Sequence, residues 1–247
     1  MGQFDGRVAL VTGGARGIGR AICMALAREG AHVAVNYRGQ ADAAEEVAEY
    51  VRQRGGRAIT VQADMGDPES VETLVERART ELGRITLLVN NAAYTHLLNH
   101  EELTFHRWQR FMRTNVDGPF LTMWAVKQDM IDAGGGAVVN ISSLAGVNPH
   151  PDMIGYGASK AALNQLTRAA AIALAPLSIR VNAITPGMVA TPRQETVSAE
   201  LREQLTKAVP LGRPGTPEEL ANVALFLLSD AASFVTGSVV TVAGGQS

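Results

Sequence analysis

The stretch Val8-Ala9-Leu10-Val11-Thr12-Gly13-Gly14-Ala15-Arg16-Gly17-Ile18-Gly19 decides the fold. Its first four residues are apolar, as in a buried strand, and residues 17–29 have the apolar pattern of a helix that ends at Gly30. The glycines lie between these two elements, where they permit a tight turn and a close approach of the backbone to a pyrophosphate. The stretch therefore predicts a β–turn–α unit that binds a dinucleotide.

Short apolar strands alternate with helices along the rest of the chain. We expect the other strands at 33–35, 58–61, 87–89, 137–141, 178–184 and 238–242, and the other helices at 41–54, from 67 onward, over 105–131, around Tyr156 to 174, and over 199–208. Continuous apolar strands joined by helices indicate a parallel sheet that is buried on both faces. We predict an α/β fold: one doubly wound (Rossmann) domain over residues 1–247, with a mostly parallel seven-stranded sheet and helices on both faces.

Residues 186–217 are the least regular part of the chain. They contain five prolines, although 199–208 has a helical pattern. A segment this long between the last two strands is typical of a substrate lid, which we predict within the domain.

Composition excludes several classes of function. The net charge is -2 and the sequence pI is about 6.2, so no basic field attracts nucleic acid or an anionic membrane. No run of 18 apolar residues predicts a membrane span, and the first residues lack an apolar secretion core. The single cysteine, Cys23, lies in an apolar run and is interpreted as a buried hydrophobe. We expect a cytoplasmic protein.

The residues around the glycine turn also predict which coenzyme is bound. The N-terminus of the following helix offers free N–H groups and a partial positive charge to phosphates. An acid at the end of the second strand would bind a free ribose 2′-hydroxyl, but this chain has Asn36-Tyr37-Arg38 there. Arg16 and Arg38 can instead bind a 2′-phosphate, so we predict NADP(H) in preference to NAD(H). The alternatives are a plain tight turn and two solvated arginines.

Ser143, Tyr156 and Lys160 form the candidate catalytic group. Lys160 follows Tyr156 by four residues, which places both side chains on one face of a helix. A phenol is a poor base at neutral pH, but a neighbouring ammonium favours the phenolate and lowers the pKa of the phenol. Tyr156 can then exchange a proton with an alcohol or alkoxide, while the Ser143 hydroxyl holds the substrate oxygen. The alternative is a surface pair without a catalytic role.

With these motifs the chain resembles the short-chain dehydrogenase/reductase family over nearly its whole length. The matching residues are Thr12 to Gly19, Asn90-Asn91-Ala92, Asn115, Ser143, Tyr156, Lys160 and Pro186 to Thr191. Two departures are Ala93 in place of a usual glycine, and Ala243-Gly244-Gly245 in place of a frequent Asp-Gly-Gly. Ala93 implies a small shift near the site, and Ala243 lacks a carboxylate near a subunit contact.

The resemblance implies further roles. Asp64 would bind the adenine amino group with Met65 beside it, and Asn90 would support the cofactor and the sheet. Asn115 would bind a water that relays protons to Lys160, and Lys160 would also hold the nicotinamide ribose. Gly187, Val189 and Thr191 would fix the carboxamide and so choose the face of the nicotinamide ring. The implied catalytic residues are Asn115, Ser143, Tyr156 and Lys160, and the implied cofactor-binding residues are Gly13, Arg16, Gly17, Ile18, Gly19, Tyr37, Arg38, Asp64, Met65, Asn91, Ala92, Tyr156, Lys160, Pro186, Gly187, Val189 and Thr191.

The expected activity is NADPH-dependent, reversible reduction of a ketone or oxo-ester. The family also contains 3-oxoacyl-carrier-protein reductases, which the chain resembles, but a docking face for an acidic carrier should be basic. Residues 129–133 and 175–177 contain no cation, so we favour a free small carbonyl compound and retain the acyl substrate as an alternative. A non-catalytic NADPH sensor is a second alternative. The resemblance further implies a homotetramer.

The residues after the fourth strand predict contacts with substrate. Tyr94 and His96 are candidate substrate contacts at the mouth of the site. His96 and His100 have helical spacing, but the proposed chemistry needs no Lewis acid, so we predict no metal site. Trp108 and Trp124 lie in the expected long helix and are interpreted as core or subunit contacts.

Overall fold

The predicted seven-stranded parallel sheet is confirmed. A computed structural model of the chain describes residues 2–191 and 199–246. All neighbouring strands in it pair in parallel, in the order β3-β2-β1-β4-β5-β6-β7. The strands are β1 (Val8–Val11), β2 (His32–Tyr37), β3 (Ala58–Gln62), β4 (Ile85–Asn90), β5 (Gly136–Ile141), β6 (Ile179–Pro186) and β7 (Val239–Val242).

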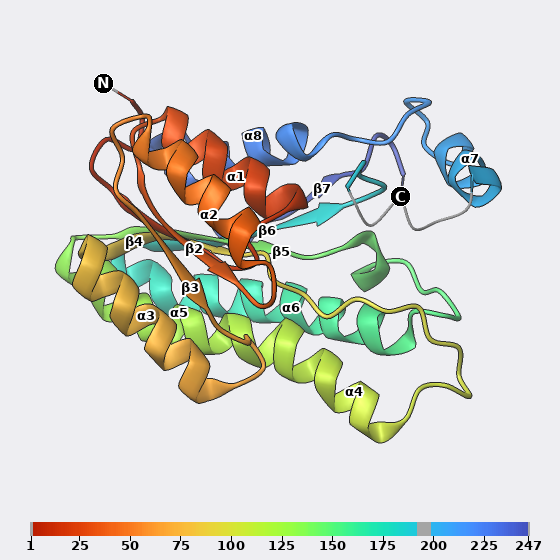
Figure 1. The fold of residues 1–247 in the computed structure, drawn as a ribbon. Coiled ribbons are helices and arrows are strands. Elements are labelled where there is room, and N and C mark those ends of the chain that lie inside the picture. The colour runs from red at the N-terminus through yellow and green to blue at the C-terminus, as the bar shows by residue number, and fades with distance from the viewer. Residues whose placement is uncertain (1, 192–198, 247) are drawn as a thin grey trace.

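Helices cover both faces of this sheet (Figure 1). One face carries α1 (Gly17–Arg28), α2 (Ala41–Arg52) and α8 (Pro217–Leu228), and the other carries α3 (Pro68–Leu82), α5 (Gly118–Asp132) and α6 (Ile154–Leu174). Each face buries its own apolar cluster, which explains why the central strands are apolar at every position. The remaining helices are α4 (Phe105–Met112) and α7 (Ala199–Lys207).

The sheet order places a crevice between two of its strands. The chain runs outward from β1 to β2 and β3, and then returns to β4 on the other side of β1. At such a switch point the loops after the two central strands diverge and leave room for a ligand at their carboxyl ends. The glycine turn follows β1 and Asn91 follows β4, so the fold brings both predicted motifs to this crevice.

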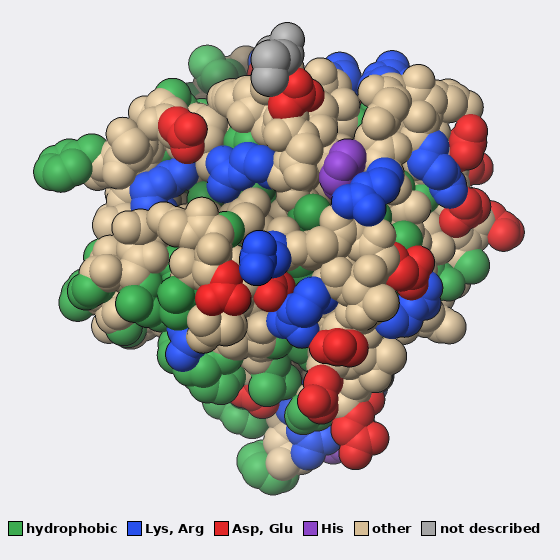
Figure 2. Space-filling view, turned by 90° about the vertical axis from the view of Figure 1, so that its left-hand side faces the viewer, with side chains coloured by type: hydrophobic (Ala, Val, Ile, Leu, Met, Phe, Trp, Pro, Cys, Tyr) green, Lys and Arg blue, Asp and Glu red, His purple; other side chains and the backbone are tan. Residues whose placement is uncertain are grey.

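The opposite end of the sheet carries the amino ends of the strands. Figure 2 looks onto this end and shows blue Lys and Arg side chains across the middle of the face. This end faces away from the crevice, since all strands run the same way.

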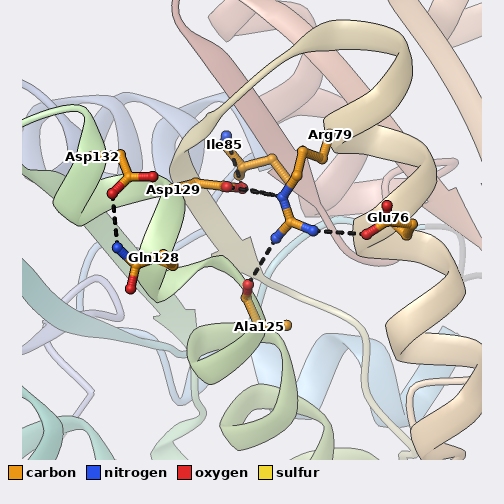
Figure 3. A network of polar contacts seen from close by, with 7 residues as sticks. All are labelled: Glu76, Arg79, Ile85, Ala125, Gln128, Asp129 and Asp132. Atoms are coloured by element: carbon orange, nitrogen blue, oxygen red, sulfur yellow. Dashed lines mark hydrogen bonds and ion pairs between the residues drawn. The ribbon is translucent and has the colours of Figure 1, made fainter.

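A polar network fixes α3 against α5 near the start of β4 (Figure 3). Arg79 Nε donates to Asp129 Oδ1 at 2.8 Å, and Arg79 Nη2 donates to the Ala125 carbonyl at 3.0 Å. Asp129 also accepts from the backbone N–H of Ile85 at 3.4 Å. The hydrogen bond to Asp129 raises the pKa of Arg79, so the pair stays charged.

The expected helix over 105–131 is not a single α-helix. A π-helical turn, η1 (Arg113–Asp117), separates α4 from α5, and Asn115 lies within it. A π-turn inserts one extra residue into the helix and is frequent at functional sites. Periodicity misses it because the apolar pattern continues across the insertion.

Helix α8 is a second feature that the sequence analysis lacks. Thr216 caps it: the Thr216 side chain accepts from the Glu219 N–H, and the Glu219 carboxylate accepts from the Thr216 N–H. Pro217 occupies its first turn. This helix packs on α1, and its Leu220, Ala221 and Ala224 are buried.

The predicted lid spans residues 186–217, and the parts of it near its two ends are attached to the rest of the domain. Val189 pairs with Gly215 in an isolated bridge, and the Leu211 N–H donates to the Gly244 carbonyl. Residues 192–198 of this segment lie outside the described residues. The closing role of the lid stays a prediction.

Candidate active site

The glycine turn has the geometry of a phosphate cradle. Gly13 and Gly17 have φ values of +62° and +54°, which residues with a side chain rarely adopt. Arg16 is the N-cap of α1, and no side chain caps its first turn. The first N–H groups of the helix are therefore available to an anion.

Three polar side chains hold this turn in place, a role that the sequence did not predict for any of them. Asn36 Oδ1 accepts from the Gly13 N–H at 3.0 Å. Thr12 Oγ1 accepts from the N–H groups of Asn91 and Ala92, and Asn91 Nδ2 donates to the carbonyls of Thr12 and Gly13. Their positions in the sequence could have indicated this role. Each is a polar residue at the end of an apolar strand, where its side chain can form hydrogen bonds with the backbone N–H and C=O groups of the loops.

A cavity of about 450 Å³ lies over the turn at the carboxyl ends of the strands. It brings together eleven of the residues implied to bind cofactor: Gly13, Arg16, Gly17, Ile18, Tyr37, Arg38, Asp64, Met65, Asn91, Ala92 and Thr191. The glycines leave room in it that a Cβ would fill: an added Cβ on Gly13 would lie 3.0–3.3 Å from Asn91 and Ala92. The cavity thus lies beside a glycine turn and the free N–H groups of α1. This combination fits a dinucleotide.

The charges around this cavity match the sequence-based expectation. Arg16 and Arg38 both line it and are exposed. The one carboxylate among the lining residues is Asp64, whose Oδ1 accepts from the Gly66 N–H at 2.9 Å. That carboxylate follows β3, and its role toward an adenine stays a prediction.

Six residues implied to bind cofactor do not line this cavity. Gly19 lies beneath the turn and packs against it, because an added Cβ would lie 2.3 Å from the Gly13 carbonyl oxygen. Pro186 ends β6, and the Gly187 N–H donates to Val242. The other three are Val189, Tyr156 and Lys160.

Ser143 and the helix that carries Tyr156 are packed closely together. Ser143 follows β5 and caps the short 3₁₀ turn η2 (Leu144–Gly146), where its Oγ accepts from the Ala145 N–H at 3.2 Å. An added Cβ on Gly146 would lie 2.7 Å from the Lys160 carbonyl carbon, and one on Gly157 would lie 2.7 Å from the Ala145 carbonyl oxygen. The two glycines thus let the Ser143 loop lie directly on the first turns of α6.

Lys160 is held inside the protein beside Tyr156. Its Nζ donates to the Ile141 carbonyl at 2.7 Å and lies 5.8 Å from the centre of the Tyr156 ring. The side chain is buried, and burial lowers the pKa of its ammonium from the ordinary 10.5 to about 7. From the sequence, Lys160 is expected as an ammonium beside Tyr156 and, by resemblance, as a member of a proton relay. In the folded chain it exchanges its proton near neutral pH, as a group that transfers protons should.

We expect Lys160→Met to stabilise the fold in a pH-dependent way. Because the folded pKa lies below the unfolded pKa, the unfolded chain binds more protons between about pH 7 and 10.5. The free energy of unfolding of the wild type therefore rises with pH in this window, by at most about 1.4 kcal/mol per pH unit. The gain from Lys160→Met should be largest at pH 7 and below, and should vanish toward pH 10.5.

Denaturant unfolding from pH 6 to pH 10 measures this effect. Lys207→Met serves as the control, since Lys207 is 73% exposed. If the free energy of unfolding of Lys160→Met differed from that of the wild type by the same amount at every pH, Lys160 would not be a buried amine that titrates.

Asn115 connects the loop after β4 with α6. Its Oδ1 accepts from the Tyr94 N–H at 2.8 Å, and its Nδ2 donates to the Tyr94 carbonyl and to Ser159 Oγ. Ser159 Oγ in turn donates to the Tyr156 carbonyl at 2.7 Å. Asn115 thereby positions the backbone around Tyr156. The water that the resemblance assigns to Asn115 stays a prediction.

A buried aromatic cluster lies next to Tyr156. The Tyr94 ring centre is 4.8 Å from that of Phe111 and 4.5 Å from that of His96, and Phe111 is 6.5 Å from Tyr156. Tyr94 and His96 thus lie near the candidate catalytic group, as the substrate-contact interpretation requires. Residues 91–103 form no helix, so the helical spacing inferred for His96 and His100 is wrong.

The described residues form neither a cluster of metal ligands nor a helix that could span a membrane. Within 2–191 and 199–246, no three His, Cys, Asp or Glu side chains are grouped so that they could hold a metal ion. No helix in the same ranges is long and apolar enough to cross a bilayer.

Comparisons with known proteins find relatives over nearly the whole chain. A family model described as enoyl-(acyl carrier protein) reductase matches residues 13–247. The chain is 37% identical to a 3-oxoacyl-[acyl-carrier-protein] reductase of Staphylococcus aureus over 96% of this chain and 97% of that one. It is 40% identical to the cis-4-hydroxycyclohexanecarboxylate dehydrogenase of Sinomonas cyclohexanicum, over 99% and 98%.

A solved structure is similar to nearly the whole fold. It is a 7α-hydroxysteroid dehydrogenase complexed with NADH and 7-oxo glycochenodeoxycholic acid, with a TM-score of 0.94 and 35% identity over 98% of this chain and 95% of that one. These relatives match the chain from end to end, so the shared feature is the whole enzyme and not one motif. The chain belongs to the short-chain dehydrogenase/reductase family, whose oxidoreductases use NAD(P)(H) and act on CH–OH and carbonyl groups.

Proposed function

We propose that this enzyme is an NADPH-dependent reductase that converts a small ketone or oxo-ester to a secondary alcohol, reversibly. The observation that carries the proposal is the burial of Lys160 beside Tyr156, one strand away from the cavity over the glycine turn. When bound, the nicotinamide supplies or accepts the hydride.

The residues of the chain supply binding and proton transfer. The turn and the first N–H groups of α1 bind the phosphates, and Asp64 binds the adenine. Ser143 donates a hydrogen bond to the substrate oxygen, and Tyr156 gives that oxygen a proton as it becomes an alkoxide. When Lys160 is protonated, its ammonium favours the phenolate that Tyr156 becomes after giving up its proton. Because the pKa of Lys160 is lowered to about 7, Lys160 can also pass a proton onward.

The preference for NADPH is supported by Arg16 and Arg38, two cations in a cavity whose lining has one carboxylate, Asp64. The similar 7α-hydroxysteroid dehydrogenase holds NADH, so the family fold alone does not decide the choice. The two guanidinium groups favour the coenzyme that carries an extra phosphate.

We favour a carbonyl compound with an apolar or cyclic body, because Tyr156 lies beside the buried aromatic pair Tyr94 and Phe111. The similar cyclohexanecarboxylate dehydrogenase is named for a ring substrate. The alternative, an acyl chain on a carrier protein, is supported by the similar 3-oxoacyl reductase.

The test measures coenzyme oxidation with a panel of cyclic ketones, open-chain oxo-esters and a 3-oxoacyl thioester. We expect turnover with NADPH, and at least about tenfold weaker binding of NADH, the effect of one charge-assisted contact. Arg38→Ala should reduce that preference while binding of NADH is unchanged. Equal affinity for both coenzymes would refute the NADPH preference, and tight NADPH binding without any turnover would favour the sensor alternative.

We also propose a homotetramer in the cytoplasm. The exposed Phe120 and Trp124 stack with ring centres 4.5 Å apart on α5, and Ile172 on α6 is 79% exposed. Exposed apolar groups on neighbouring helices suit contact with another copy. A monomeric mass in light scattering would contradict this assembly.

A further inference from the structure

A second recess lies at the opposite end of the sheet from the coenzyme cavity. It has a volume of about 500 Å³ and is formed where β1, β4, β5 and β6 begin. Its lining includes Arg7, Arg84, Arg180 and the loop Gly134-Gly135-Gly136. It opens on the face that Figure 2 shows.

Positive charge dominates this recess. Three guanidinium groups line it, and the one carboxylate in the lining is Asp230. That carboxylate is 99% exposed and its Oδ1 lies 3.9 Å from Arg7 Nη1, so solvent screens the pair. Burial lowers the pKa of both Arg7 and Arg180, the charge of Asp230 partly opposes this in both, and the charge of Arg7 lowers the pKa of Arg180 further. With three guanidinium groups and one solvent-screened carboxylate in its lining, the recess carries a net positive charge.

Two of the arginines are held in place by the fold. Arg180 donates to the carbonyls at the end of α8, with Nη1 to Leu227 at 2.6 Å and Nη2 to Ser229 at 2.8 Å. Arg7 Nε donates to Thr86 Oγ1 at 3.4 Å. Side chains fixed in this way lose little entropy when a ligand arrives.

The third arginine is available to a ligand. Arg84 precedes β4, is exposed, and makes no hydrogen bond or ion pair with the part of the chain that the structure describes. Its guanidinium can close over whatever occupies the recess. Opposite it, Gly134 has a φ of +79°, and an added Cβ would meet no atom within 4 Å. The glycine loop thus leaves the space open.

We propose that this arginine recess binds a small oxyanion, either a phosphate ester or a carboxylate. Planar guanidinium groups bind both kinds of anion through paired hydrogen bonds, and the ligand would supply the charge that Asp230 does not. The site is separate from the coenzyme cavity, which shares none of its lining residues. It does not depend on the proposed function.

Calorimetric titration tests the recess directly. The protein carries Arg16→Ala and Arg38→Ala to remove the two arginines of the coenzyme cavity, and it is saturated with NADH so that the glycine turn is already occupied by coenzyme phosphates. Inorganic phosphate, glycerol phosphate and citrate are titrated separately at constant ionic strength. We expect saturable binding with one site per chain for at least one of them, and the anion that binds identifies the ligand class.

Variants at Arg84 distinguish anion binding in the recess from a general effect of the protein's charge on anion binding. Arg84→Ala should weaken binding by about tenfold, as loss of one charge-assisted contact does, and Arg84→Glu should abolish it. Arg54→Ala is the matched control, because Arg54 is exposed, lies outside the recess and contacts Tyr50. Circular dichroism confirms that each variant is folded. Absence of saturable binding for all three anions, or equal weakening by Arg84→Ala and Arg54→Ala, would overturn the proposal.

Discussion

Tyr156→Phe should lower kcat by about 10³ or more, while the affinity for NADPH stays within a few-fold of wild type. Transfer of a proton by a positioned side chain contributes roughly 10²–10⁴ to an enzymatic rate. The variant removes the hydroxyl that exchanges a proton with the substrate and retains the ring against Phe111. The residues that line the cavity over the glycine turn are unchanged, so coenzyme binding has no reason to fail.

Stopped-flow measurement of coenzyme oxidation, together with fluorescence titration of NADPH, separates the two effects. Tyr94→Phe is the matched control, since it deletes the same hydroxyl from a ring in the same aromatic cluster. It should change KM and leave kcat nearly unaltered. A Tyr156→Phe enzyme with wild-type kcat would remove Tyr156 from the mechanism.

The sheet and the location of the crevice could be predicted from the sequence for a physical reason. Strands buried on both faces are apolar at every position, so their runs stand out between amphipathic helices. The glycine turn is also visible, because only glycine adopts the backbone angles found at Gly13 and Gly17 without strain. Eleven implied cofactor residues then meet in one cavity, since the fold brings the carboxyl ends of the strands together.

Other features depend on contacts that no local pattern reveals. The π-turn at Asn115 changes the hydrogen-bond ladder without changing the apolar repeat around it. Asn36 is a polar residue in an apolar strand, and its hydrogen bond to the Gly13 N–H joins positions 23 residues apart. The pKa of Lys160 depends on burial, which exists only after α6 has packed on β5.

The arginine recess also could not be predicted from the sequence, because it depends on residues that are far apart along the chain. Its three arginines come from separate segments at the starts of β1, β4 and β6, and each alone resembles a solvated surface residue. A parallel sheet gathers these starting points at one end, just as it gathers the catalytic loops at the other. Net charge, at -2 for the whole chain, conceals this local excess.

Gly19→Ala should weaken coenzyme binding strongly. An added Cβ would lie 2.3 Å from the Gly13 carbonyl oxygen and 2.5 Å from Asn91 Nδ2, distances at which something must move. The Gly13 carbonyl accepts a hydrogen bond from that same Asn91 side chain, so the turn shifts as a unit. We expect the Kd for NADPH to rise by about a hundredfold, or roughly 3 kcal/mol, and overpacking to cost stability of about 1–3 kcal/mol.

Isothermal titration with NADPH and denaturant unfolding measure the two consequences separately. Gly215→Ala makes the same chemical change where an added Cβ would lie 3.7 Å from its nearest neighbours, so it should leave both quantities near wild type. Because the predicted damage comes from moving the turn, the unfolding midpoint and the affinity should fall together in Gly19→Ala. If affinity stayed at the wild-type value while stability fell, the position of Gly13 would not control phosphate binding, and the cradle assigned to this turn would be wrong.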